Sequence, residues 1–256
     1  YETEKNKLME KLQEVCSLLF QRQNLLVSVT GGREGYAALR NMSDQITDGL
    51  YADTEKESIE ISLPDQKNEG FKDASQIQYV SLAGNYAQSG FSYHGAMRVF
   101  KVIMNYEYLW QNIRVKGGAY GCSTNVGRNG DVCFLSYRDP NLERTLEVYR
   151  GVTDYLKEFE LDERGMTRFV IGAFSELDAP LTPMSQGRRS LLSYLTGVSY
   201  EMIQKEREQA LHTCPQDIRN LAETMQAVLD HSYICAIGNE GKLQEEADLF
   251  DVLKTL

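Results

Sequence analysis

The fold of this chain is decided by residues 113–137, whose sequence is IRVKGGAYGCSTNVGRNGDVCFLSY. Two stretches within it, at about 117–126 and 131–137, are rich in β-branched and aromatic residues, which is typical of strands. Between them lies Gly127-Arg128-Asn129-Gly130, made of residue types that form tight turns. The segment therefore predicts a β-hairpin, and the rest of the chain is interpreted outward from it.

A long amphipathic helix is predicted directly before the hairpin. Its apolar residues recur at helical spacing and predict one buried stripe, formed by Val99, Ile103, Tyr106, Trp110 and Ile113. Ser92 is placed to cap the first turn of this helix, and Gln76–Ala83 ahead of it predicts a strand. After the hairpin, Asp139-Pro140 predicts the start of a helix that runs to about 159, because proline suits the first helical position.

The first 75 residues predict a helix, a strand, a second helix and a loop. Residues 4–22 carry apolar side chains at helical spacing, namely Leu8, Leu12, Val15 and Leu19. Leu25–Thr30 predicts a strand that ends at Gly31-Gly32, and residues of about 33–49 predict the second helix. Residues 50–75 are polar and without periodicity, so they predict a long loop or an excursion at the edge of a sheet.

The chain is mostly helical from residue 162 onward. Helices are predicted over about 162–178, from Thr182-Pro183 and from Ser199. Thr213-Cys214-Pro215-Gln216 has the Thr-x-x-Gln form of a capping box and predicts a fourth helix. His231–Ile237 predicts a closing strand, which a short helix follows.

Interleaved strands and helices with a hairpin predict the α+β class, as a layered antiparallel or mixed sheet with helices packed on one face. A chain of 256 residues is long enough to bury a sizeable core. No internal repeat, low-complexity segment or linker is evident, so residues 1–256 predict a single domain.

Composition excludes several classes of function. The net charge of −10 and the isoelectric point of about 4.9 argue against a nucleic-acid partner, because phosphate binding needs clustered Lys and Arg. No apolar run approaches the roughly 20 residues that cross a bilayer, so no membrane association is expected. Five scattered cysteines without a Cys-x-x-Cys pair indicate a reducing compartment. The chain starts without methionine, and we expect it to be part of a longer protein.

The sequence gives little support for a metal site or for a catalytic nucleophile. His94, His212 and His231 are the three histidines, and they form neither a His-Glu-x-x-His nor a His-x-x-Glu-His motif. We therefore expect no metal site in this chain, and we interpret His94 as a capping or packing residue. Cys214 lies two residues from His212, but we interpret it as a thiol at a helix start rather than as a nucleophile.

A second loop competes as a binding site. Thr30-Gly31-Gly32-Arg33-Glu34-Gly35 is predicted to follow a strand and to open a helix, which is the context of a dinucleotide fingerprint. Thr30 replaces the first glycine of that pattern, and a tight turn explains the other glycines equally well. Nucleotide binding is therefore kept only as an alternative.

Arg114 and Tyr120 are the remaining candidates. One interpretation makes Arg114 a charge at the helix C-terminus and Tyr120 an ordinary strand aromatic. The other rests on Gly117 and Gly118, because paired glycines in a strand often mark close approach by a ligand or another backbone. If the strand begins at residue 117, Gly118, Tyr120 and Cys122 share one face, with open space before the tyrosine.

The segment Leu109–Gly121 resembles the C-terminal half of presequence-protease and falcilysin-type enzymes, which are pitrilysin (insulysin) family metallopeptidases. Further stretches resemble the same group in the same order, namely Asn24–Gly31, Ser136–Pro140, Leu177–Pro180 with Pro183, and Ile237–Asn239. The resemblance implies a clamshell of two halves, in which an N-terminal half carries zinc on a His-x-x-Glu-His motif with glutamate as general base. It implies that the C-terminal half carries no metal.

The resemblance also assigns roles. It implies that Arg114 and Tyr120 reach the substrate, the guanidinium holding a substrate carbonyl and the phenol stabilising the oxyanion. Gly117 and Gly118 would let the substrate approach. The expected function is the noncatalytic half of a zinc endopeptidase that degrades unstructured oligopeptides, with no cofactor in this chain and the N-terminal half as partner. A noncatalytic peptide-binding or scaffold module is the alternative, and the expected compartment is the cytoplasm or the mitochondrial matrix.

Overall fold

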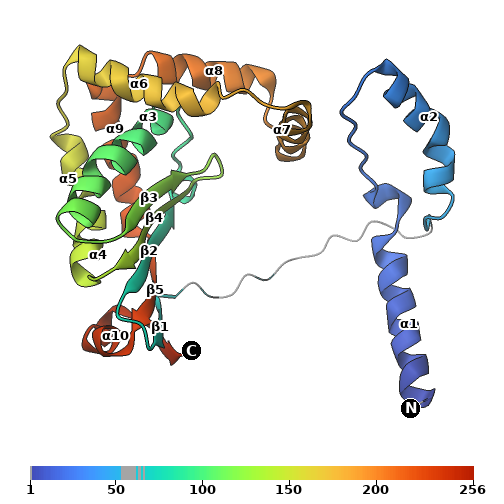
Figure 1. Ribbon diagram of the computed structural model, residues 1–256, viewed down its shortest axis with the longest axis horizontal. Helices are drawn as coiled ribbons and strands as arrows, with labels where there is room; N and C mark the ends of the chain where they lie inside the picture. The colour runs from blue at the N-terminus through green and yellow to red at the C-terminus, as the bar shows by residue number, and fades with distance from the viewer. Residues whose placement is uncertain (1, 53–61, 63–64, 66) are drawn as a thin grey trace. The chain divides into compact units, whose positions relative to one another are not determined.

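The computed structural model describes residues 2–52, 62, 65 and 67–256, which group into two compact units (Figure 1). One unit comprises Tyr1–Leu63 and Pro180–Ser199, and the other comprises Pro64–Ala179 and Tyr200–Leu256. Each unit is described by itself. This grouping into compact units does not test the prediction of a single domain over residues 1–256, which stays a prediction.

The first unit is helical. It contains α1 (Glu2–Leu19), a 3-10 turn (Arg22–Asn24), α2 (Arg33–Thr47) and α7 (Pro183–Thr196). The helices predicted over 4–22 and 33–49 are therefore confirmed. α7 starts at Thr182-Pro183 as predicted, and the Thr182 side chain caps it by accepting a hydrogen bond from the Ser185 amide at 3.2 Å.

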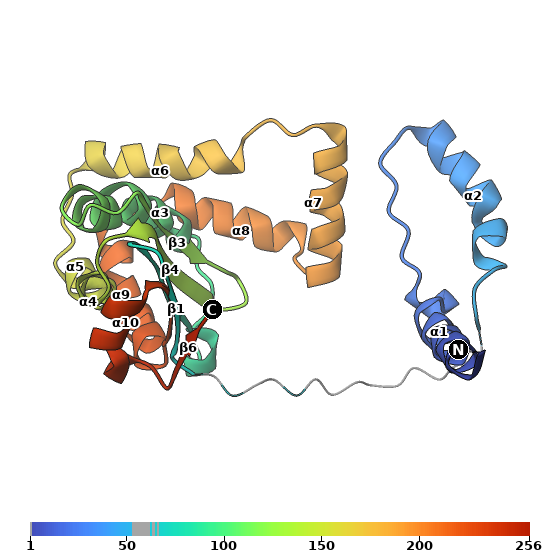
Figure 2. The ribbon, with the colours of Figure 1, turned by 60° about the horizontal axis from the view of Figure 1, so that its bottom comes forward.

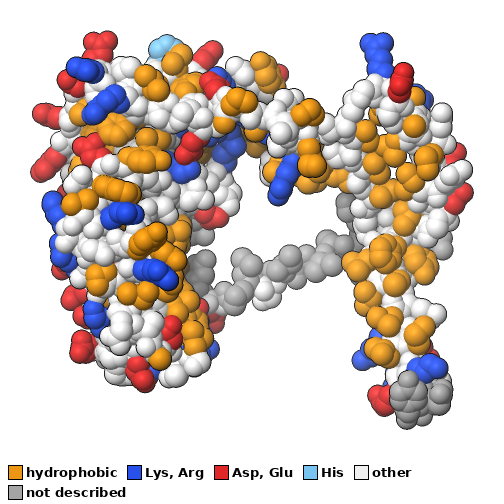
Figure 3. All heavy atoms as spheres, in the orientation of Figure 1, with side chains coloured by type: hydrophobic (Ala, Val, Ile, Leu, Met, Phe, Trp, Pro, Cys, Tyr) orange, Lys and Arg blue, Asp and Glu red, His pale blue; other side chains and the backbone are white. Residues whose placement is uncertain are grey.

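The strand predicted over Leu25–Thr30 is wrong. The segment is extended but pairs with no strand in the described part of the chain, and Leu26 and Val27 are each 48% exposed. A β-branched sequence favours a strand only where a neighbour completes the hydrogen-bond ladder. Apolar side chains also stay exposed along α1, including Leu8, Leu12 and Leu19. Figure 3 shows hydrophobic side chains gathered on the surface of these N-terminal helices.

The second unit is built on a six-stranded mixed sheet in the order β3-β4-β2-β5-β1-β6. The strands are β1 (Glu69–Asp73), β2 (Gln78–Asn85), β3 (Gly121–Val126), β4 (Asp131–Asp139), β5 (Tyr233–Asn239) and β6 (Val252–Thr255). Helices lie over one face of the sheet, as Figures 1 and 2 show for α3, α4, α5 and α9. The predicted α+β class with a mixed sheet is confirmed, as is the hairpin of β3 and β4.

The loop predicted over 50–75 is wrong at its end. Residues 53–61, 63, 64 and 66 lie outside the described residues, but β1 is an inner strand that pairs in parallel with β5 and β6. Its sequence, EGFKD, is short and polar, so it carries no alternation to detect. Gly70 fits there because a Cβ at this position would lie 2.6 Å from the Leu253 side chain.

The helix before the hairpin departs from the predicted stripe. It begins as α3 (Ala96–Ile103) and continues through two π-helical segments, η3 (Met104–Tyr108) and η4 (Trp110–Val115). The wider π turn shifts later side chains around the axis. Val99, Ile103 and Ile113 are buried as predicted, whereas Tyr106 and Trp110 are 68% and 37% exposed.

The predicted helix starts are confirmed in part. Ser92 does not cap α3, which starts after Gly95 without a side-chain cap. The helix predicted from Pro140 starts later, because α4 (Glu143–Arg150) follows Leu142 and is succeeded by α5 (Val152–Lys157). The remaining helices are α6 (Glu163–Leu177), α8 (Tyr200–Leu211), α9 (Pro215–Asp230) and α10 (Glu240–Glu245). The capping box of α9 uses Cys214 and Asp217, one residue beyond the predicted pair.

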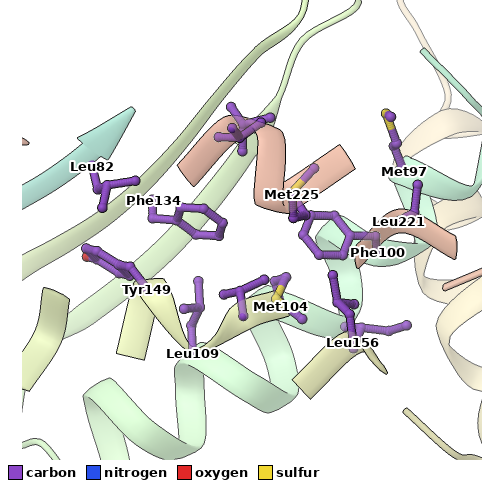
Figure 4. Packing of buried hydrophobic residues seen from close by; sticks show 14 of the residues in the cluster. Leu82, Met97, Phe100, Met104, Leu109, Phe134, Tyr149, Leu156, Leu221 and Met225 are labelled. Carbon is purple, nitrogen blue, oxygen red and sulfur yellow. The ribbon is translucent and has the colours of Figure 1, made fainter. Parts of the chain in front are cut away.

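The core fills the space between the sheet and its helices. Figure 4 shows Leu82 and Phe134 from the sheet facing Tyr149, Leu109 and Met104 from the helices. All five side chains are at most 1% exposed, and the rings of Phe134 and Tyr149 stack with centroids 5.5 Å apart. Packing of this kind holds β4 rigidly against α4 and thereby fixes the strand ends that carry the candidate site.

A charged cluster ties the hairpin turn to the helices. Glu206 of α8 is 7% exposed and accepts hydrogen bonds from Arg128 Nε and Nη2 at 2.7 and 2.5 Å. Arg98 Nη2 of α3 lies 3.4 Å from the same carboxylate. Both guanidinium groups lie near the Tyr93 ring, with Cζ 5.6 Å (Arg128) and 5.9 Å (Arg98) from its centroid. One buried carboxylate therefore compensates two arginines.

No helix among the described residues is long and apolar enough to cross a membrane.

Candidate functional site

One face of the sheet is not covered by the helices α3, α4, α5 and α9, and it is called the open face below. Along β2 and β4 the buried side chains of Val80, Leu82 and Phe134 alternate with exposed ones on the open face. Tyr79 and Tyr137 are 38% and 45% exposed there. Their rings meet edge to face with centroids 5.3 Å apart, so two neighbouring strands present one aromatic surface.

Arg114 lies at the end of η4, beside this surface. Its guanidinium Cζ is 4.4 Å from the Trp110 ring centroid and 5.6 Å from the Tyr120 ring centroid. It donates a hydrogen bond from Nη1 to the Tyr120 carbonyl oxygen. The two residues predicted from their spacing are therefore adjacent, and Trp110 holds the arginine by a cation–π contact.

Tyr120 carries its phenol on the exposed side. It is 63% exposed, and its ring packs edge to face on Tyr137 with centroids 5.7 Å apart. Its amide donates a hydrogen bond to the Arg138 carbonyl at 3.3 Å. Its hydroxyl makes no hydrogen bond to any residue that the structure describes, so it can donate to a ligand.

Gly117 and Gly118 form the turn that brings Arg114 and Tyr120 together. A Cβ on Gly117 would lie 2.4 Å from the Ile113 carbonyl oxygen, and Gly118 has a φ of 81°, which favours glycine. Asn141 Nδ2 secures the turn by donating to the Gly117 carbonyl at 2.7 Å. The shared strand face of Gly118, Tyr120 and Cys122 is wrong, because β3 begins only at Gly121. The contact of Gly117 and Gly118 with a substrate stays a prediction.

Cys122 is no nucleophile for this site. Its side chain packs against the core rather than on the open face. Burial raises the pKa of the Cys122 thiol to about 11, although nearby Arg114 acts in the opposite direction. The thiol is therefore protonated near neutral pH, and a thiolate mechanism has no support here.

The other residues considered from the sequence, His94, His212 and Cys214, make local structural contacts. His212 Nδ1 lies 2.9 Å from the Glu208 carbonyl, and Cys214 serves in the capping box of α9. His94 Nδ1 accepts a hydrogen bond from the Ala96 amide at 3.2 Å, next to the start of α3, although His94 is not the N-cap residue of that helix. In the described ranges, no three His, Cys, Asp or Glu side chains are grouped to hold a metal ion.

The alternative nucleotide loop lacks its predicted context. Gly32 does precede α2, but no strand leads into the segment Thr30–Gly35. A Cβ at Gly31, Gly32 or Gly35 would meet no atom within 4 Å. The glycines therefore serve no close approach to any residue that the structure describes.

A cavity of about 500 Å³ lies at the other end of the open face. Ala83, Cys133 and Tyr233 form part of its floor. Acidic groups dominate its charged lining, which comprises Asp65, Lys67, Glu69, Asp131 and His231. The open face is thus positively charged at the arginine end and mainly acidic at the far end.

Comparison with known proteins identifies the architecture. Residues 68–240 match the family model described as the PreP C-terminal domain. The mixed sheet with its helix layer is also the fold of the peptidase M16 inactive domain from Pseudomonas fluorescens, which is known from a crystal structure. That structure aligns with a TM-score of 0.56 and 14% identity, over 80% of this chain and 51% of that one. The family model covers more than half of the chain, and the chain belongs to the PreP C-terminal domain family.

Curated relatives agree with the family. Protein HypA of Clostridium perfringens is 37% identical over 256 residues, which cover 100% of this chain and 26% of that protein. Presequence protease 1, chloroplastic/mitochondrial, of Arabidopsis thaliana is 30% identical over 259 residues, 97% of this chain and 24% of that protein. The chain therefore spans about a quarter of the length of these relatives.

Proposed function

We propose that this chain is the substrate-binding, metal-free part of a zinc endopeptidase that cleaves unstructured oligopeptides. The observation that carries the proposal is the pair of half-buried Arg114 and exposed Tyr120, whose guanidinium and phenol ring lie together beside the open face. The names of the presequence-protease relatives support a peptidase. The histidines here do not form a metal site, so zinc and the general base are assigned to a part of the protein outside residues 1–256.

The two side chains supply electrostatic stabilisation. Attack on a peptide bond turns its carbonyl oxygen into an oxyanion, and the free Tyr120 hydroxyl is a donor for that charge. Arg114 presents its remaining donors to a neighbouring substrate carbonyl while Trp110 and the Tyr120 carbonyl fix its plane. Neither group cleaves a peptide by itself, because neither activates a nucleophile.

Binding tests this proposal without the metal. Trp110 is the only tryptophan and lies against Arg114, so an unstructured peptide bound at the site changes its fluorescence. We expect saturable binding, and Arg114→Ala to weaken it roughly tenfold, because a charge-assisted hydrogen bond is lost. Titration midpoints measured by anisotropy of a labelled peptide give the affinities.

Arg168→Ala is the matched control, since Arg168 is an exposed residue of α6 and its loss changes the net charge equally. Equal affinity of wild type and Arg114→Ala would contradict the proposed site. A noncatalytic peptide-binding module remains the alternative, and cleavage assays separate it from the peptidase. The compartment, cytoplasm or mitochondrial matrix, stays a prediction.

A further inference from the structure

Arg138 has an unusual backbone. Its φ is 50°, and it is the one non-glycine residue with positive φ in the part of the chain that the structure describes. A residue with a Cβ is strained in this region, and such strain persists where the surrounding structure enforces it. Strained residues cluster at functional sites, so the position calls for a physical explanation.

The strain coincides with a β-bulge. Along the β2–β4 pair, Val80 lies opposite Ser136, but Gln78 lies opposite Asp139. Two steps on β2 therefore correspond to three on β4, and one residue of β4 is extra. Tyr137 and Arg138 are both exposed between buried Ser136 and buried Asp139. The bulge thus brings Arg138 out beside Tyr137, where regular alternation would bury it.

Buried hydrogen bonds hold the bulge in place. The Asp139 carboxylate is fully buried and accepts from Thr145 Oγ1 at 2.7 Å and from the Asn141 amide at 2.9 Å. The Arg138 carbonyl accepts the Tyr120 amide. The Arg138 backbone is therefore joined directly to the candidate site.

The Arg138 guanidinium has no acidic partner. Its Cζ lies 5.7 Å from the Tyr137 ring centroid, and it forms no ion pair or hydrogen bond with any residue that the structure describes. By contrast, Arg128 and Arg207 both bind carboxylates. An uncompensated arginine on an exposed aromatic surface of a protein with net charge −10 is suited to an anionic ligand.

We propose that Arg138 binds a carboxylate of the peptide that lies beside Tyr120. The carboxylate belongs either to the peptide C-terminus or to an acidic side chain, since the guanidinium fork fits both equally. The inference rests on the proposed function and adds a charge preference to it. Glycine would adopt the positive φ at this position with less strain. We therefore explain the presence of arginine here by a role of its side chain.

The test uses the chain of residues 1–256 and four labelled peptides of one unstructured sequence. They carry a C-terminal acid or amide, each combined with an internal Glu or Gln. We expect Arg138→Ala to weaken binding roughly tenfold for the peptide that holds the recognised carboxylate, and by less than about twofold for its neutral counterpart. Arg138→Lys should recover part of the affinity, and Arg168→Ala should change none.

Thermal melting separates binding from folding. Arg138→Gly should melt about 2–4 °C above Arg138→Ala, because glycine adopts positive φ without strain. It should nevertheless bind as weakly as Arg138→Ala. A gain in stability over Arg138→Ala without any gain in binding is not expected if Arg138 is a purely structural residue.

Three outcomes overturn the inference. If Arg114→Ala weakens binding and Arg138→Ala does not, or if acid and neutral peptides lose affinity equally, the carboxylate role is wrong while the proposed function stands. If wild type binds none of the four peptides, the proposed function fails and this inference fails with it.

Discussion

Replacing Tyr120 by Phe is expected to lower the turnover number of peptide cleavage by about 100-fold in the complete protein, because removal of one oxyanion donor typically costs two to three orders of magnitude. The substitution keeps the ring contact with Tyr137 and removes only the free hydroxyl. KM should change little, since the hydrogen bond strengthens as charge develops on the substrate oxygen. Steady-state kinetics on a fluorogenic peptide measure both constants.

Tyr106→Phe provides the control for this experiment. Tyr106 is 68% exposed and lies on η3, outside the candidate site, so loss of its hydroxyl should leave both constants within about twofold. A raised KM with unchanged turnover in Tyr120→Phe would mean uniform binding rather than transition-state stabilisation. Unchanged kinetics would remove the oxyanion role.

Glu206→Ala is expected to lower the free energy of unfolding of the second unit by about 2–3 kcal/mol. The substitution leaves Arg98 and Arg128 without their shared carboxylate, and unpaired, partly buried charges are costly. The estimate lies below the full cost of breaking a buried pair, because both arginine side chains retain solvent contact. Urea unfolding followed by Trp110 fluorescence reports on this unit, since Trp110 lies within it.

Glu176→Ala is the matched comparison. Its carboxylate is 3.4 Å from Lys101 Nζ but 60% exposed, so its loss should cost under about 1 kcal/mol. Equal effects of the two substitutions would show that the cluster contributes no more than a surface ion pair. Glu206→Ala should also increase the opening of the hairpin turn that contains Arg128. Faster amide hydrogen exchange in that turn would show this local effect.

The sequence predicted those elements whose structure depends only on neighbouring residues in the chain. The hairpin followed from its turn glycines and strand composition, and helices such as α1 followed from apolar side chains at helical spacing. β1 escaped detection because its place between β5 and β6 depends on partners distant in the chain. Leu25–Thr30 failed for the converse reason, since it has strand composition without a partner.

The candidate site was predictable in part. The spacing of Arg114 and Tyr120, with the resemblance, singled out both residues, and the structure brings them into contact. The π-helical turns that place Trp110 beside Arg114 leave no clear pattern in the sequence. Arg138 escaped notice because a β-bulge and a positive φ depend on the register between strands. Only the neighbouring Asp139-Pro140 was a local signal, and it predicted a helix start.

The central claim is that this chain completes a metal-dependent peptidase without holding the metal. A peptide-hydrolysis assay tests this claim most directly. Residues 1–256, the remainder of the protein, and a mixture of both are each incubated with zinc and a fluorogenic peptide. The account predicts no bound zinc and no cleavage for residues 1–256, and rapid cleavage only for the mixture. Chelator-sensitive cleavage by residues 1–256 alone, or full activity of the remainder without them, would contradict it.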